Sequence, residues 1–175
     1  QGRATFVNIR RFLTYHLTDN VAELAPFVVW ALSGGEIPLM ISVLQVLALD
    51  IGTDLLPALA LGGEPPESDV LGRAFGFLGP MEALLSLLML PVGAWLLFDW
   101  PHSPLPTTGP ALATLSTLVF ASIVLMQMAN AFECRSASAS LFSISPFANR
   151  LLLAAVGIEL ALLMAFIYLK LLTDV

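Results

Sequence analysis

The stretch "LALDIGTDLLPALALG", residues 47–62, places two aspartates, Asp50 and Asp54, inside a very apolar window of the chain. Burying a carboxylate in apolar surroundings is costly unless a partner or an ion compensates its charge. Asp50, Thr53 and Asp54 are spaced i, i+3 and i+4, so a helix presents all three on one face. Pro57 lacks an N–H, which leaves the carbonyl of Thr53 without its usual helical partner. The stretch therefore predicts a polar, locally irregular site within an apolar helix.

The composition excludes an ordinary water-soluble domain. The chain has 175 residues, of which 58% are hydrophobic and 11% charged, and its mean hydropathy is +0.89. Soluble domains carry roughly a quarter charged residues, so we expect an integral membrane protein whose partner is the lipid bilayer. The net charge of −6, with seven lysines and arginines and no basic patch, gives no sign of nucleic-acid binding. The single Cys134 excludes an intrachain disulfide and a paired-cysteine metal site.

Five apolar segments are long enough to cross a bilayer, which takes about 20 helical residues. Turn-rich links with glycine, proline and serine separate these segments. We predict an all-α, polytopic transmembrane helix bundle with short loops, a single membrane domain over residues 1–175. The predicted spans are residues 12–32, 38–61, 75–98, 110–132 and 147–172.

The basic residues predict an orientation. A threading with five spans puts six arginines on one side and Lys170 on the other; the six are Arg3, Arg10, Arg11, Arg73, Arg135 and Arg150. Basic residues favour the cytoplasmic side of a membrane. We therefore expect a multi-pass protein with a cytoplasmic N-terminus, in the plasma membrane.

Further polar residues lie inside the predicted spans, where ionisable groups usually face the bundle interior and mark a functional pathway. The first span carries Asp19, Asn20 and Glu23, with Asn20 and Glu23 on one helix face. The fourth span carries Gln127 and Asn130, for which a hydrogen bond between helices is the alternative to a ligand role. The fifth span carries Glu159, a candidate for a proton site or an accessory ligand.

Two other polar residues are expected to play smaller parts. Glu82 lies near an end of the third span, so we expect it at the membrane interface. His16 has no second histidine nearby in the sequence, so we expect it to pack within the bundle rather than to bind a metal. The remaining oxygen donors suit hard cations, so the predicted ligand is Na⁺, K⁺, Ca²⁺ or H⁺.

The residues then resemble a known family. "NIRRFLTYHLTDNVAEL" and "IPLMISVLQVLALDIGTDLLPALALGGEPPE" are similar to the fifth and sixth membrane helices of the P-type cation-transporting ATPases. "VLMQMANAFECRS" and "SPFANRLLLAAVGIELALL" resemble that family's eighth and ninth helices. The resemblance covers essentially the whole chain, and its most specific part is the D-x-x-T-D-x-x-P-A-x-x-L-G run.

The resemblance implies a set of cation ligands. The residues that match the family's ligands in the fifth and sixth helices are Asn20, Glu23, Asp50, Thr53 and Asp54. Gln127 and Asn130 match the contribution of the eighth helix, and Asp19 and Glu159 are further accessory candidates. Asp50 and Gln127 look more like the Na⁺/K⁺ pumps than the reticulum type of Ca²⁺ pump, while Asp19 departs from the small hydroxyl residue common there.

The resemblance also implies partners for this chain. The D-K-T-G-T and T-G-D-G-x-N-D motifs of the family do not occur in the sequence. We therefore expect the cytosolic catalytic domains to be absent, and this chain alone not to hydrolyse ATP. As an ion translocase it would work with the remaining membrane helices and cytosolic domains of the pump, through which ATP and Mg²⁺ would act.

Two other classes of function stay open from the sequence. A passive channel or secondary cation transporter could use the same acidic residues, and a non-transporting accessory or fragment membrane protein could merely resemble the pump. The upstream reading frame distinguishes these alternatives, because a pump requires the phosphorylation motif.

Overall fold

The computed structural model describes residues 2–61, 74–135, 147 and 149–168, and within them the regular secondary structure is all helical. This confirms the predicted all-α bundle. The helices are α1 (Gly2–Leu32), α2 (Val43–Ala48), α3 (Leu55–Leu61), α5 (Gly79–Phe98), α6 (Gly109–Glu133) and α7 (Arg150–Tyr168). Two π-helical segments join them: η1 (Leu49–Asp54) connects α2 to α3, and η2 (Ala74–Leu78) leads into α5.

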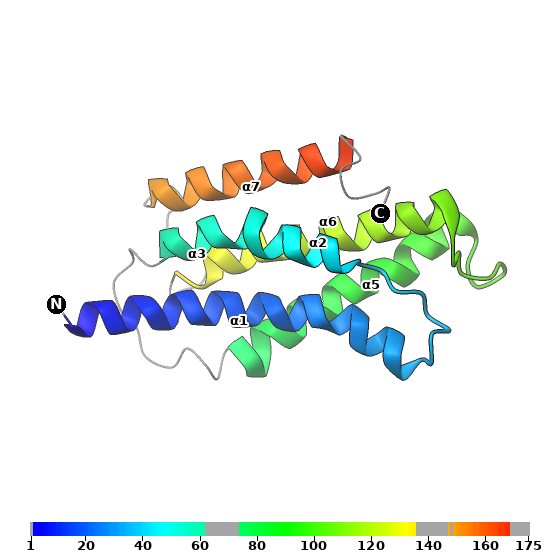
Figure 1. Ribbon diagram of the computed structural model, residues 1–175, viewed down its shortest axis with the longest axis horizontal. Helices are drawn as coiled ribbons and strands as arrows, with labels where there is room; N and C mark the ends of the chain where they lie inside the picture. Colours follow the sequence, from blue (N-terminus) through cyan, green and yellow to red (C-terminus); the bar gives the residue numbers. More distant parts are fainter. Residues whose placement is uncertain (1, 62–73, 136–146, 148, 169–175) are drawn as a thin grey trace.

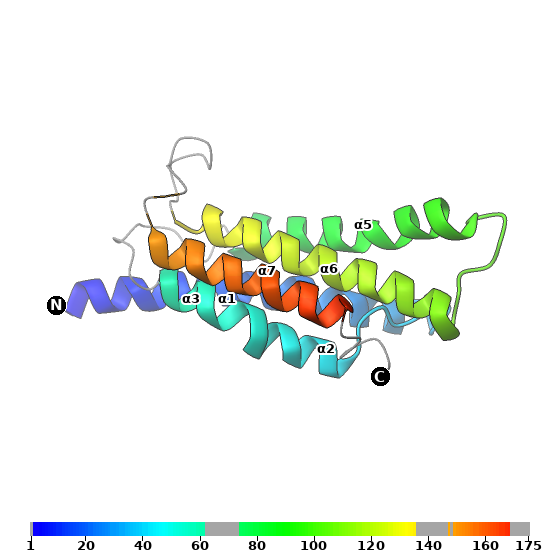
Figure 2. The same ribbon diagram turned by 90° about the horizontal axis from the view of Figure 1, so that it is seen from above.

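The helices run up and down along one long axis (Figure 1). α1, α5 and α7 run in one direction, whereas α2–η1–α3 and α6 run in the other. α6 contacts α1, α3, α5 and α7, and α1 contacts α3, α5 and α6. Seen from above, α7 lies over α6 and α3 (Figure 2). The start of α1, the end of α6 and the start of α7 lie at the same end of the bundle.

Two helix boundaries follow from local sequence. The second membrane helix begins at Val43 and not at Pro38, because Ser42 caps it. The Ser42 hydroxyl accepts from the backbone N–H of Gln45, and the Gln45 side chain accepts from the backbone N–H of Ser42, a capping box. α1 ends at Leu32, and Gly34 and Gly35 follow at φ 64° and 87°, a conformation that glycine adopts without strain.

Four helical segments of the described residues are long and apolar enough to cross a membrane: Val43–Leu61, Gly76–Phe98, Gly109–Glu133 and Arg150–Tyr168. α1 is not among them, because its polar stretch from His16 to Glu23 lowers its hydropathy. The five-span arrangement therefore stays a prediction. α1 nevertheless packs against three of these four segments along the bundle.

The bundle exposes many large apolar side chains and buries several ionisable ones. Large apolar side chains point outward, among them Leu59, Leu84, Trp95, Leu96 and Leu151, which are 56–64% exposed. Glutamate, aspartate and amide side chains are meanwhile enclosed by the helices. This arrangement suits a hydrocarbon solvent, where apolar residues face lipid and ionisable groups face the bundle interior.

Two clusters of buried apolar residues fill the bundle. The first includes Leu49, Leu115, Val119, Ile123, Met128 and Leu163. The second includes Tyr15, Ala58, Leu61, Ala131, Leu152 and Ala155. On η1, α6 and α7, buried polar residues lie between the parts of each helix that belong to the two clusters: Thr53 and Asp54, Asn130, and Glu159.

Candidate functional site

A layer of buried polar side chains lies between the two apolar clusters. We define the polar layer as seven residues that are each no more than 6% exposed: Asp19, Glu23, Asp54, Glu82, Gln127, Asn130 and Glu159. They come from α1, η1, α5, α6 and α7, so every long helix of the bundle contributes. Glu159 lies at the middle of α7, and Asp54 near the middle of the Val43–Leu61 segment. The layer is thus well inside the apolar part of the bundle.

Two parallel hydrogen bonds join α1 to α6 within this layer. The side-chain amide of Asn130 donates to Oδ1 of Asp19 at 3.0 Å. One helical turn away, the amide of Gln127 donates to Oε1 of Glu23 at 3.0 Å. The two helices are antiparallel, so residues four apart on α1 meet residues three apart on α6. The amides therefore satisfy one oxygen of each carboxylate and fix its orientation.

The other buried carboxylate oxygens in the layer accept no hydrogen bond from an N–H or hydroxyl donor among the described residues, although the carboxyl groups of Glu82 and Asp19 lie within hydrogen-bonding reach of each other. These buried atoms are Asp19 Oδ2, Glu23 Oε2, Asp54 Oδ2, and both oxygens of Glu82 and of Glu159. Native proteins pair nearly all buried polar atoms with protein groups or water. A concentration of unpaired acceptors is therefore the feature of this bundle that most needs a ligand.

The charged neighbours of the layer increase this need. In the described part of the chain, the charged groups that act most strongly on Asp54 are Glu23, Glu159, Asp50 and Glu82. All of them are acidic. Like charges this close repel one another in a low-dielectric interior, so the cluster requires protons or a bound cation to neutralise it.

The helix that carries the two aspartates departs from α geometry at the aspartates themselves. η1 is a π-helical turn, wider than an α-helix, and such turns frequently occur at functional sites. Thr53 Oγ1 donates to the carbonyl oxygen of Leu49 at 2.9 Å and lies 3.4 Å from Asp54 Oδ1. The sequence predicts a departure from α-helical geometry before Pro57, and the structure has a π-helical turn there.

His16 lies next to two of the predicted cation ligands. One imidazole nitrogen and one carboxylate oxygen each from Asp50 and Asp54 all lie within 4.8 Å of one another. The imidazole also stacks on Phe12. The expectation that His16 packs within the bundle rather than binds a metal stays a prediction. The proximity to Asp50 and Asp54 arises because α1 and η1 are adjacent in the folded bundle.

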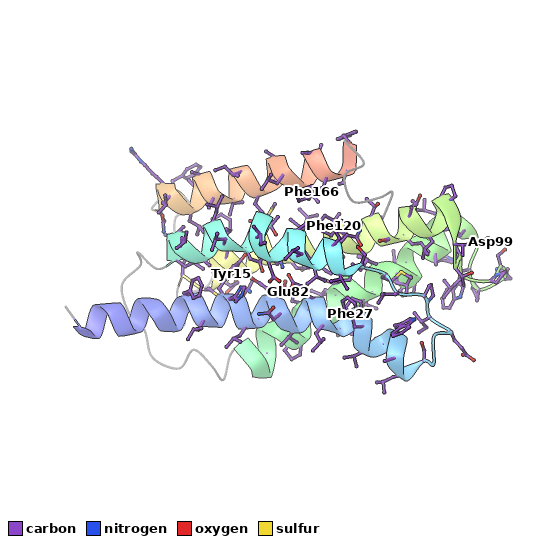
Figure 3. The ribbon with its side chains drawn as sticks, in the orientation of Figure 1. Tyr15, Phe27, Glu82, Asp99, Phe120 and Phe166 are labelled. Carbon is purple, nitrogen blue, oxygen red and sulfur yellow. The ribbon has the colours of Figure 1, made fainter. Side chains whose placement is uncertain are left out.

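Glu82, which the sequence places near one end of its span, is 4% exposed and belongs to the polar layer. Its position at the membrane interface stays a prediction. Figure 3 shows Glu82 and Tyr15 toward the middle of the bundle, while Asp99 lies at its outer end. Ser86, which is four residues further along the same face of α5, is also buried and has no hydrogen-bond partner among the described residues. The i, i+4 spacing of Glu82 and Ser86 is the sequence signal that indicates a polar, inward-facing side of this helix.

The predicted cation ligands differ in how deeply they are buried. Glu23, Thr53 and Asp54 are buried, whereas Asp50 and Asn20 are half-buried. On α1 the residues that face α6 are Asp19 and Glu23, which are four apart and both bonded to its amides. Asp19 therefore lies in the layer more fully than Asn20 does.

Comparison with known proteins identifies relatives of this bundle. The family model "Cation transporting ATPase, C-terminus" matches residues 38–175. A calcium-transporting ATPase of Bacillus subtilis strain 168 is 33% identical over 178 residues, which cover 96% of this chain and 19% of that protein.

Two relatives from rat are named for the transport of other cations. A potassium-transporting ATPase alpha chain 2 is 41% identical over 73 residues, which cover 42% of this chain and 7% of that protein. A sodium/potassium-transporting ATPase subunit alpha-4 is 27% identical over 187 residues, which cover 81% of this chain and 18% of that protein. The chain thus spans only a minor part of each relative's length.

Proposed function

Because this chain belongs to the cation-transporting ATPases, within their C-terminal region, we propose that it forms the ion-binding membrane portion of an ATP-driven P-type pump. It is a multi-pass membrane bundle, and its chemistry is that of cation coordination. The remaining membrane helices and the cytosolic domains of the pump would be its partners.

The observation that carries the proposal is the polar layer with its unpaired carboxylate oxygens. Burying charged side chains in a membrane bundle costs free energy, and such residues mark ion pathways. A cation bound between several carboxylates neutralises their mutual repulsion and takes the place of the hydrogen-bond donors that their oxygens lack. Oxygen ligands of this kind suit hard cations. Na⁺, K⁺, Ca²⁺ and H⁺ are therefore the candidates for the transported ion.

Each site residue has a proposed role. Glu23, Asp50 and Asp54 supply negative charge, and Asn20 and Thr53 supply neutral oxygens. Asp19, Gln127, Asn130 and Glu159 are accessory: the two amides hold the carboxylates of α1 in place, and Glu159 adds a buried acid from α7. The π-helical turn η1 contains Asp50 and Asp54, so a change of its helix geometry would alter cation affinity.

We also propose how the bundle sits in the cell. The start of α1, the end of α6 and the start of α7 carry Arg3, Arg10, Arg11, Arg135 and Arg150 near one end of the bundle. Basic residues favour the cytoplasmic side, so this end would face the cytoplasm of a plasma-membrane pump. ATP, acting with Mg²⁺ through cytosolic domains, would drive helix movements that open and close the polar layer.

Substitution of Asp54 tests the proposal. In the full-length pump, Asp54→Asn is expected to abolish cation-dependent phosphorylation or dephosphorylation, because it removes a buried charge at the centre of the layer. Asp99→Asn is a matched control, since Asp99 is exposed and its φ of 55° is one that asparagine tolerates. Unchanged transport by Asp54→Asn would refute the proposal, as would cation flux through the reconstituted protein without ATP.

A further inference from the structure

His16, Asp50 and Asp54 form a group of potential ligands that differs in chemistry from the rest of the site. The imidazole comes from α1 and the two carboxylates come from η1. The three ligand atoms lie within 4.8 Å of one another. With metal–nitrogen and metal–oxygen bonds of about 2.0–2.2 Å, three ligand atoms around one ion lie about 3–3.6 Å from one another. The three side chains are therefore near enough to share an ion if their ligand atoms move closer together by about 1 Å.

The surroundings of the group favour a ligand over simple packing. Asp54 is completely buried, and its Oδ2 has no hydrogen-bond partner among the described residues. The imidazole of His16 stacks on Phe12, with the ring centroids 5.9 Å apart and an angle of 25° between the planes. The stacking restricts rotation of the imidazole ring, so the His16 side chain loses less conformational entropy when it binds an ion. His16 and Asp50 are half-buried, so the group lies at the edge of the buried interior.

The nitrogen changes which ions the group prefers. Na⁺, K⁺ and Ca²⁺ take oxygen ligands, whereas imidazole is a good ligand for divalent first-row transition metals. A set of one imidazole and two carboxylates suits ions that accept both donor types, such as Mn²⁺ or Zn²⁺. An oxygen-only site would lack this preference.

We infer that His16, Asp50 and Asp54 bind a divalent first-row transition-metal ion as cargo of the pump. The inference rests on the proposed function and adds a class of ion to the hard cations considered there, because His16 adds a nitrogen donor to the oxygen ligands. His16 coordinates the ion through one imidazole nitrogen, and Asp50 and Asp54 each provide one carboxylate oxygen. The remaining coordination positions are available to water or to other oxygens of the layer.

Mn²⁺ bound to the full-length pump tests this inference directly, because its paramagnetism reports on its ligands. We expect electron spin echo spectroscopy of bound Mn²⁺ to show coupling to an imidazole nitrogen. His16→Gln is expected to remove that coupling and to weaken Mn²⁺ binding at least about tenfold, since even residues that only orient ligands cost this much when lost. Ca²⁺ binding, measured on the same preparations, should change much less.

Two further variants keep the result interpretable. His102→Gln removes the other histidine, which lies in an exposed loop, and should leave both the nitrogen coupling and the affinity unchanged. His16→Asp replaces nitrogen by oxygen, so Mn²⁺ should still bind but without the coupling. This variant also shows whether position 16 tolerates substitution.

The failures of the two proposals are distinguishable. Wild-type pump that binds no Mn²⁺, or binds it without nitrogen coupling, overturns the inference about His16. Equal losses of Mn²⁺ and Ca²⁺ affinity in His16→Gln also overturn it, because they indicate a general structural role. The pump proposal stands in each case if cation-dependent phosphorylation still requires Asp54.

Discussion

The side-chain amide of Gln127 donates a hydrogen bond of 3.0 Å to Oε1 of Glu23, joining α6 to α1 across 104 residues of sequence. Both residues are buried, and the second oxygen of Glu23 has no partner among the described residues. The amide thus holds one carboxylate oxygen and leaves the other available for an ion. This division of roles makes Gln127 a positioning residue for the proposed cation site.

Gln127→Leu should weaken the apparent affinity for the transported cation by about 10- to 100-fold, because a hydrogen bond to a charged group contributes roughly 1.5–3 kcal/mol. The measurement is the cation dependence of phosphorylation in the full-length pump. Gln45→Leu is the matched control, since Gln45 is also buried but bonds to Ser42 and Ser116, outside the polar layer. Equal shifts in cation affinity for the two variants would contradict a specific role for Gln127.

Asn130→Leu should lower the stability of the bundle by about 1–3 kcal/mol, because it leaves Asp19 buried without the donor that it has now. Thermal unfolding of the purified pump, followed by tryptophan fluorescence, measures the effect. The double variant Asp19→Leu, Asn130→Leu should recover most of the loss, since replacing both partners by apolar groups can be nearly neutral. Additive losses in the double variant would show that the two side chains do not depend on each other.

Glu82→Met should raise thermal stability in the absence of transported cations. Both carboxylate oxygens of Glu82 are buried and accept no hydrogen bond from an N–H or hydroxyl donor among the described residues, and the carboxyl group within hydrogen-bonding reach, that of Asp19, is itself acidic. Burying a polar group without a donor costs about 1–3 kcal/mol on mutational scales. Methionine has a similar length and no such cost. Glu36→Met is the control, because Glu36 is exposed. A lower melting temperature for Glu82→Met would mean that a stabilising partner already compensates Glu82.

Gly93→Val should destabilise the contact between α5 and α6. A Cβ atom at Gly93 would lie 2.8 Å from Leu118 Cδ2 and 3.2 Å from Leu115 Cδ2, closer than carbon atoms pack. Overpacking of this kind costs about 1–3 kcal/mol. Gly157→Val in α7 is the matched control, because nothing lies within 4 Å of a Cβ there. Comparison of the two melting temperatures checks the prediction, and equal values would contradict close packing at Gly93.

The membrane character and helical fold could be predicted from the sequence because both depend on local properties. A run of apolar residues long enough to cross a bilayer must form a helix, since its backbone groups have no water to bond. The acidic stretch around Asp50 and Asp54 was recognisable for the same reason: each charge stands out against its own apolar neighbours. Pro57 even indicated where the helix would depart from α geometry, and η1 lies there.

The contacts of the site depend on which helices are neighbours, and a single sequence does not contain that information. The spacing of Asn20 and Glu23 predicts a shared face, but the packing of α1 against α6 selects Asp19 and Glu23. Glu82 lies near the start of its helix in the sequence, yet the neighbouring helices enclose it.

The sequence by itself determined that this chain is an apolar helical bundle with acidic residues at the depth of the membrane, because helix period and hydropathy act within a segment. Only the tertiary structure decided that His16 of α1 lies beside Asp50 and Asp54 of η1. Contacts between helices arise from side-chain packing across segments distant in sequence, and that packing brings a nitrogen ligand to a site that otherwise contains oxygen donors.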